Sequence, residues 1–179
     1  MDTLVIRRTK FSDGYLLQTV EAVALASREP RPACIRIVNL IHDSFRHYTW
    51  TGFYLRRDTS LTLEFYRGAV ATLPEPQESL DGLLGWALRS RRTQIIPDAA
   101  IDPRYAHIEI PIKSEIIVPL RFHGRPAGVL DICSERPRAF DRLDLDLLEA
   151  AGSALAPLAA LLTTDAPALQ MPRRAQGFG

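Results

Sequence analysis

The sequence predicts an α/β fold with a mostly antiparallel sheet, and three observations support this fold class. Apolar residues recur at helical spacing near both ends of the chain, over residues 13–26 and from about 141 to 162. Two stretches between them, 49–66 and 114–133, each contain a pair of β-rich segments joined by turn residues. One helical segment, 81–91, separates these two predicted hairpins. This order of elements indicates a single α/β domain.

The bulk composition is that of an ordinary globular protein. The chain has 179 residues, of which 46% are hydrophobic and 24% are charged, so it can bury a sizeable core. Its 22 lysines and arginines balance 21 aspartates and glutamates, leaving a formal charge of +1. Because no strong positive field results, we expect no nucleic-acid partner and no anionic membrane partner.

Cysteine usage and the first residues suggest a cytoplasmic protein. The two cysteines, Cys34 and Cys133, are far apart and form no CxxC motif, which does not fit a secreted disulfide framework. The N-terminus lacks the basic-then-apolar order of a signal peptide, and no apolar run approaches the length of a membrane span.

Two helices are predicted before the first hairpin. Ser12 or Asp13 can cap a helix that reaches about Ala26, and two prolines in residues 29–32 should then interrupt the chain. A second helix follows, and its predicted apolar stripe contains Ile35, Val38, Ile41, His42 and Phe45.

The first hairpin is predicted from strands at 49–55 and 61–66, joined by the turn residues 57–60. A proline-containing loop and the helix at 81–91 come next, followed by a short strand at 93–96. Residues 98–113 are expected to form a long loop with at most one helical turn.

The central hairpin is the clearest local signal. Its strands, 114–122 and 127–133, are nearly continuous in apolar residues, so we expect them in the buried middle of the sheet. Gly124 can adopt the positive φ of a tight turn. Pro119 removes one backbone donor, which predicts a bulge or a solvent-facing position there.

A long helix should begin near Asp141, with an aspartate cap and acidic residues in its first turns. Pro157 is expected to kink or end it. The organisation predicted is an N-terminal segment and helix at 1–29, a domain at 30–162 and a mobile tail at 163–179. The apolar stripe predicted for the last helix contains Leu143, Leu147, Leu148, Ala151, Leu155, Leu158 and Leu162.

Four ordered passages resemble the GAF domain family, over roughly residues 30–162. They are DGLLGWA at 81–87, IPDAAIDPRY at 96–105, SEIIVPL at 114–120 continuing to GVLD at 128–131, and FDRLDLDLL at 140–148. The resemblance implies an antiparallel sheet of five or six strands with helices on both faces. It also implies a pocket between the sheet and the loops at about 73–86 and 98–113, and terminal helices that pair with a second subunit.

Within that family, WTGFYL at 50–55 and the segment from His107 to Glu115 are most similar to the free methionine-(R)-sulfoxide reductases. Those enzymes need loop cysteines, because a thiolate attacks the sulfoxide sulfur and a second thiol forms a disulfide. The matching positions here, 71–72, 83–84 and 108–110, contain no cysteine. We therefore expect no catalytic residue and no enzyme activity.

The resemblance assigns a ligand-contact role to Glu115 and Asp131, whose counterparts hold a polar ligand. The alternative is that each carboxylate is paired with an arginine such as Arg121, Arg125 or Arg138, or caps a loop amide, because an unpaired buried carboxylate is costly. Cys133 stands where the reductases have a second acidic residue, and a small buried hydrophobe or a redox-sensing thiol are its two interpretations. The predicted ligand-binding residues are Trp50, Tyr54, Trp86, Tyr105, His107, Glu115 and Asp131, although core packing can also explain the aromatic ones.

No metal and no cofactor is predicted. The four histidines have no metal-ligand spacing, and no glycine-rich phosphate loop follows a strand. The leading hypothesis is a non-catalytic module that senses a small polar metabolite, forms a homodimer through its terminal helices and signals to a separate output protein. Two alternatives are a reductase relative with altered or lost chemistry and a structural interaction domain with a filled pocket.

Overall fold

Six strands form one antiparallel sheet in the order β3-β2-β1-β6-β5-β4. This computed structural model describes residues 13–68, 77–105 and 112–165. Because every strand pair is antiparallel, the predicted antiparallel sheet is confirmed. The elements along the chain are α1 (Asp13–Ala26), α2 (Pro30–Ser44), β1 (Trp50–Arg57), β2 (Ser60–Gly68), β3 (Gln77–Ser79), α3 (Leu83–Ser90), β4 (Gln94–Ile96), a 3-10 turn η1 (Pro103–Tyr105), β5 (Ser114–Phe122), β6 (Arg125–Ser134) and α4 (Arg142–Asp165).

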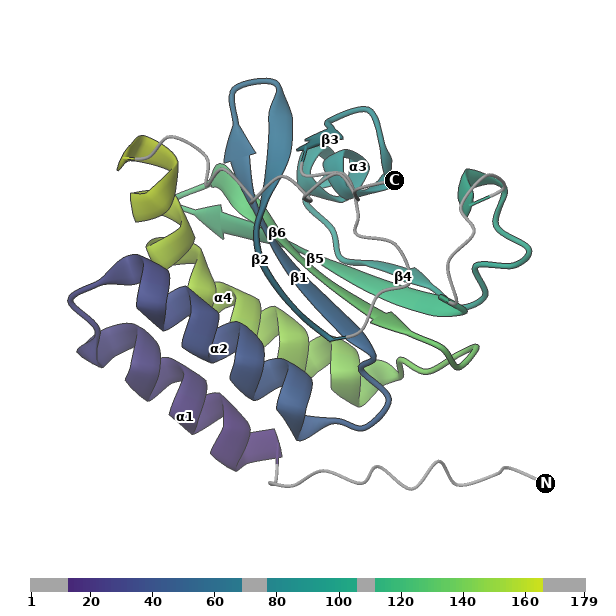
Figure 1. The fold of residues 1–179 in the computed structure, drawn as a ribbon, viewed down its shortest axis with the longest axis horizontal. Coiled ribbons are helices and arrows are strands. Elements are labelled where there is room, and N and C mark those ends of the chain that lie inside the picture. The colour runs from purple at the N-terminus through teal and green to yellow at the C-terminus, as the bar shows by residue number, and fades with distance from the viewer. Residues whose placement is uncertain (1–12, 69–76, 106–111, 166–179) are drawn as a thin grey trace, which may run out of the picture.

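The sheet separates two apolar cores (Figure 1). Helices α2 and α4 cover one face, here called the helical face, with α1 packed on their outer side, and α3 covers the other, here called the α3 face. Alternation along β1 divides its side chains between them, with Phe53 and Leu55 in the first core and Trp50 and Tyr54 in the second. The predicted helices on both faces of the sheet are thus present.

Helix α2 begins earlier than the sequence suggested. The predicted break between the two helices is present but falls at residues 27–29, and Pro30 occupies the first helical position, where its missing N–H breaks no helical hydrogen bond. The predicted stripe was also partly wrong, because Ile35 is only half-buried. The buried side of the helix is formed by Ala33, Cys34, Ile37, Val38 and Ile41.

The central hairpin closes through a two-residue turn. His123 and Gly124 have φ angles of 47° and 76°, the pairing of positive values that matches the twist of the flanking strands. The register shift in β5 falls between Leu120 and Arg121, just beyond Pro119. β4 pairs only with Glu115–Ile117, so the part of β5 that contains Pro119 has no partner strand on that side among the described residues.

Helix α4 starts with reciprocal capping. The Asp141 carboxylate accepts hydrogen bonds from the N–H groups of Leu143 and Asp144 at 2.7 and 3.0 Å, and Asp144 accepts one from the Asp141 N–H at 2.9 Å. Asp144 is buried because it also accepts a hydrogen bond from the Tyr48 hydroxyl at 2.8 Å. It takes the inward position that was predicted for Leu143, which is 56% exposed instead.

The helix also continues through Pro157 to Asp165, so of the two effects expected of this proline, a kink or an end, the end does not occur. Its apolar packing on the sheet persists on both sides of that residue, as Leu155 and Leu158 are both buried. Over Arg142–Thr163, α4 is long and apolar enough to cross a membrane by length and composition alone. Half of the most apolar part of this helix is buried inside the fold, as it is in the core helix of a soluble protein. Its length and composition are therefore weak evidence for a membrane span.

An arginine anchors the C-terminal end of α4 to the sheet. Arg57 Nη1 donates to the carbonyl of Leu162 at 2.8 Å, and its Nη2 donates to Glu64 Oε1 at 2.9 Å. Glu64 has a 2% exposed side chain and forms a second ion pair with Arg31 of α2. This network, Arg31–Glu64–Arg57, joins two helices and two strands.

Candidate functional site

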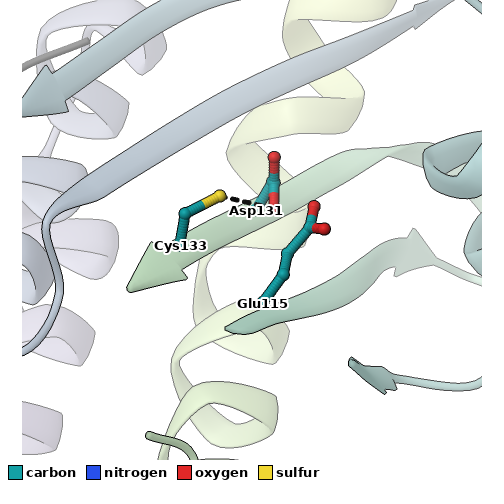
Figure 2. A group of neighbouring side chains, drawn as sticks. All are labelled: Glu115, Asp131 and Cys133. Atoms are coloured by element: carbon teal, nitrogen blue, oxygen red, sulfur yellow. Dashed lines mark hydrogen bonds between the residues drawn. The ribbon is translucent and has the colours of Figure 1, made fainter. Parts of the chain in front are cut away.

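Three polar side chains meet on the α3 face, at the centre of the sheet. Glu115 of β5 lies opposite Cys133 of β6, and Asp131 is two residues earlier on β6, so strand geometry turns all three to the same face. The Cys133 sulfur and one carboxylate oxygen each of Glu115 and Asp131 lie within 4.8 Å of one another. Figure 2 shows the Glu115 and Cys133 side chains turned toward Asp131. The three side chains are 4%, 5% and 1% exposed, in the order Glu115, Asp131, Cys133.

Burial changes the acid–base properties of the cluster. It raises the pKa of Glu115 well above its ordinary value, and the neighbouring Asp131 raises it further. Burial likewise raises the pKa of Asp131, to about 7. The pKa of the Cys133 thiol is also raised, first by burial and then by the two carboxyl groups. The two carboxyl groups therefore hold protons to a higher pH than exposed acids do.

The cluster has few protein partners. The Cys133 thiol donates to Asp131 Oδ1 at 3.9 Å, while Glu115 Oε2 is buried without a hydrogen-bond partner in the described part of the chain. Neither carboxyl group forms an ion pair among the described residues. The alternative pairing with Arg121, Arg125 or Arg138 is thus absent there, and Arg121 instead donates to the Gly124 carbonyl.

Two aromatic side chains of β1 lie beside the cluster on the same face. Gly52 pairs with Asp131 in the sheet, and the six-membered ring of Trp50 covers it, only 2.0 Å from where a Cβ would stand. A side chain at position 52 would displace this ring, which explains the glycine within a strand. Trp50 Nε1 is buried without a hydrogen-bond partner among the described residues. Tyr54 is 2% exposed, and burial followed by the Asp131 charge raises the pKa of its hydroxyl.

Trp86 lies at the outer side of this region, on α3. Its side chain is 44% exposed, and the Arg104 guanidinium lies 5.8 Å from the centre of its ring. Arg104 forms an ion pair with Asp102 and acts electrostatically on Glu115, whose pKa it lowers by less than burial raises it. The Tyr105 side chain and all of His107, both predicted to contact ligand, lie outside what the structure describes.

Sequence reasoning missed three residues of this region. Arg104 stands beside Tyr105 in the IPDAAIDPRY passage, but the basic residues singled out lay elsewhere. Glu78 is on β3, a short strand that no periodicity indicated, and its charge raises the pKa of both cluster carboxyl groups. Gly52 was visible as a glycine inside a predicted strand, which is a signal of close approach.

Neither cysteine has the environment of a nucleophile. Cys34 is buried on α2 in the helical-face core, where burial raises its pKa to about 12. Cys133 is buried within the cluster, and its pKa is also raised. A nucleophilic thiol needs a lowered pKa and access to solvent. Of the loop positions where the reductases have cysteines, Leu83 and Leu84 begin α3, and the others lie outside the described residues.

A separate cavity of about 390 Å³ follows β2 and is lined by Leu63–Gly68. It includes none of the predicted ligand-binding residues. Tyr66, which lines this cavity, stacks on Trp50 with ring centroids 6.4 Å apart. Trp50 therefore lies between the cavity and the carboxyl cluster.

Comparison with known proteins identifies the group to which this architecture is similar. A family model described as GAF domain matches residues 36–158. GAF domain-containing protein A of Dictyostelium discoideum is 28% identical over 130 residues, which span 72% of this chain and 80% of that protein.

Reductases occur among the similar proteins as well. The free methionine-R-sulfoxide reductase of Saccharomyces cerevisiae is 33% identical over 104 residues, but the match spans only 56% of this chain and 57% of the yeast protein. The structure of reduced fRMsr from Staphylococcus aureus has a TM-score of 0.75 at 25% identity, with 83% of this chain and 96% of that chain covered.

Proposed function

The chain belongs to the GAF domain family, and from this premise we propose that it is a non-catalytic sensor of a small metabolite that has a positively charged group. The observation that supports this most is the carboxyl pair of Glu115 and Asp131, buried side by side without an ion-pair partner among the described residues. A ligand ammonium group would provide the missing charge and hydrogen-bond donors.

The surroundings of the pair suit a ligand that is apolar apart from its charged group. Trp50 and Tyr54 offer aromatic surface beside the carboxyl groups, and the indole N–H of Trp50, which has no hydrogen-bond partner among the described residues, can donate to a polar atom of the ligand. Trp86 and Arg104 lie nearer to solvent and are suited to the outer part of the ligand.

The lack of a competent thiol favours sensing over catalysis. Both cysteines are buried with raised pKa values, and the loop positions used by the reductases contain other residues. The reductase alternative is favoured by the yeast relative at 33% identity. Methionine sulfoxide turnover with thioredoxin as reductant distinguishes the two functions, and we expect none.

Thermal unfolding of the purified chain tests the binding proposal against a panel of amino acids, primary amines and neutral analogues. A ligand present at 100 times its Kd stabilises a fold by about 2.7 kcal/mol, which is readily measured as a higher Tm. We expect amine-containing compounds to raise the Tm of the parent protein but not of the variant Glu115→Gln. Glu135→Gln, an exposed acidic position, is the matched control and should respond as the parent does. If no compound separates Glu115→Gln from the parent, the sensing proposal is wrong.

The output of such a sensor is proposed to pass through a homodimer of the terminal helices to a separate protein. Leu25 of α1 and Leu161 of α4 are 88% and 54% exposed, and apolar residues at such positions favour contact with a second subunit. Native mass spectrometry reports the oligomeric state and any retained metabolite together. A monomer would contradict the dimer, and a chain that neither retains nor responds to a small molecule would favour a structural interaction domain.

A further inference from the structure

We infer that Glu115, Asp131 and Cys133 form a site for a divalent metal ion of the zinc type. The inference goes beyond metabolite sensing, because such a site can exist whether or not the pocket binds an organic ligand. It rests on three side chains from two neighbouring strands that place one thiol and two carboxyl groups around a single point (Figure 2).

The spacing of these groups is close to that of a metal-ligand set. In a tetrahedral zinc site with Zn–S of about 2.3 Å and Zn–O of about 2.1 Å, neighbouring ligand atoms are about 3.4–3.6 Å apart. Here Cys133 Sγ lies 3.9 Å from Asp131 Oδ1, and all three ligand atoms lie within 4.8 Å. Ligand atoms that are now up to 4.8 Å apart would have to approach to about 3.6 Å for one ion to bind all three.

Burial and charge also favour a cation at this point. Two carboxyl groups and a thiol are at least 95% buried, and Glu115 Oε2 has no hydrogen-bond partner in the described part of the chain. An acceptor atom left unsatisfied in the interior destabilises the fold unless something binds to it. A divalent ion would satisfy the acceptor and offset the negative charge of the ionised ligands. Their protons would pass to solvent, with no change in oxidation state.

The thiol decides which class of ion fits. Carboxylates alone would suit Mg²⁺ or Ca²⁺, which prefer six or more oxygen ligands, whereas a thiolate selects borderline or soft ions such as Zn²⁺. With three protein ligands, a tetrahedral ion keeps a fourth position for water or a ligand atom.

Titration of the metal-free 179-residue chain with Co²⁺, under reducing and oxygen-free conditions, tests this inference. Co²⁺ occupies sites that bind Zn²⁺, and it gives a thiolate-to-metal absorption band when a cysteine thiolate is one of its ligands. We expect one equivalent of Co²⁺ to produce this band and added Zn²⁺ to remove it. The band should be lost in Cys133→Ser and kept in Cys34→Ser, whose cysteine is equally buried but on the opposite face of the sheet.

Two further variants keep the test decisive if Cys133→Ser does not fold, as judged by circular dichroism. Asp131→Asn and Glu115→Gln retain the thiol but remove one ligand charge each. Each should weaken Co²⁺ binding by at least about tenfold, since even the outer partners of metal ligands commonly contribute that much. Absence of the band in the parent, its persistence in Cys133→Ser, or unchanged affinity in both carboxyl variants would overturn the inference.

The test also separates this inference from the sensing proposal. Metabolite binding measured in the presence of a chelator, without a Co²⁺ band, would overturn the metal site and leave the sensor. A Co²⁺ band in a chain that responds to no metabolite would do the reverse. Because both occupants need the same carboxyl pair, we expect an amine ligand and Co²⁺ to exclude each other.

Discussion

A carboxyl group that is buried beside a second carboxyl group keeps its proton to a higher pH than it does in water. Asp131 is such a group, because its pKa rises from 3.8 to about 7 on burial, and the pKa of Glu115 is raised as well. In the unfolded chain both acids are exposed and ionise at their ordinary values. The folded chain therefore binds more protons than the unfolded chain at mildly acidic pH.

This difference predicts that the unliganded protein loses stability as the pH rises. The contribution of Asp131 should be complete below pH 3.8, decline between that value and about 7, and be absent above it. Each unit by which a pKa differs between the two states is worth about 1.4 kcal/mol. Asp131→Asn, which has no proton to lose, should flatten the dependence and gain stability relative to the parent at pH 8. Urea unfolding at several pH values measures both effects.

The exposed acid Glu135 provides the control for the pH experiment. Glu135→Gln removes an acidic side chain that is exposed and lies outside the cluster, so it controls for the loss of one carboxyl group as such. Parallel curves for Asp131→Asn and the parent would show that Asp131 does not titrate differently in the folded chain.

Helix α3 depends on one close contact with the segment before it. A Cβ on Gly85 would stand 1.9 Å from the carbonyl oxygen of Leu80, so the helix can lie at this distance only with glycine there. Helix propensity makes the opposite forecast, since alanine is better than glycine within a helix by about 1 kcal/mol. The contact should outweigh the propensity, because the obstructing atom belongs to the backbone.

Gly85→Ala is therefore predicted to destabilise the protein by more than about 1 kcal/mol and to lower its affinity for the proposed metabolite, since α3 covers the cluster. Gly82→Ala is the matched substitution, because a Cβ there would lie 3.4 Å from the nearest atom. Gly82 is the N-cap of the same helix, where glycine is preferred to alanine, so this substitution should lower the free energy of unfolding by at most about 1 kcal/mol. Equal Tm values for the two variants would contradict the close contact.

The sequence was sufficient for the elements that have a strong local signal. The hairpin of β5 and β6 was predicted to within a few residues, because continuous apolar strands around Gly124 have few other solutions. β3 was not predicted, since its three residues, Gln77–Ser79, are all polar, whereas the equally short β4 contains Ile95 and Ile96. The exposure of Leu143 was missed because a tertiary hydrogen bond, from Tyr48 to Asp144, decides which side of the first turn faces inward.

The candidate site was predictable only in part. Glu115 and Asp131 were singled out through a family resemblance, but their mutual proximity depends on the register between two strands. No spacing in the sequence indicates that Arg104 reaches Trp86 and acts on Glu115, because these contacts join separate elements. Local patterns specify elements, whereas the chemistry of the site arises from contacts between them.

At the scale of the whole molecule, the network Arg31–Glu64–Arg57 connects the sheet with α2 and with the end of α4. Removing the Glu64 charge leaves two partly buried arginines without their shared partner. Glu64→Gln should therefore destabilise the fold by about 1–3 kcal/mol, the usual range for an unsatisfied buried group. Amide hydrogen exchange should also become faster in the last turn of α4, where Arg57 holds the Leu162 carbonyl.

The control for this prediction is a more exposed ion pair. Asp43 and Arg67 are 45% and 53% exposed, and such pairs contribute at most about 1 kcal/mol. Asp43→Asn should change both stability and the exchange rate of α4 little. If Glu64→Gln were equally mild, the network would not anchor the helix.

The division of the interior by the sheet has a consequence for communication across the molecule. Phe53 and Tyr54 are adjacent in the chain, yet one packs under the helices and the other beside the carboxyl cluster. Within the described ranges the two apolar cores share no side chain, so repacking of one core does not pass directly to the other there. Among the described residues, a change on the α3 face can therefore reach α4 in two ways: through the twist or curvature of the strands, and through the Thr93 hydroxyl beyond α3, which donates to Glu149 Oε1 of α4 at 2.7 Å.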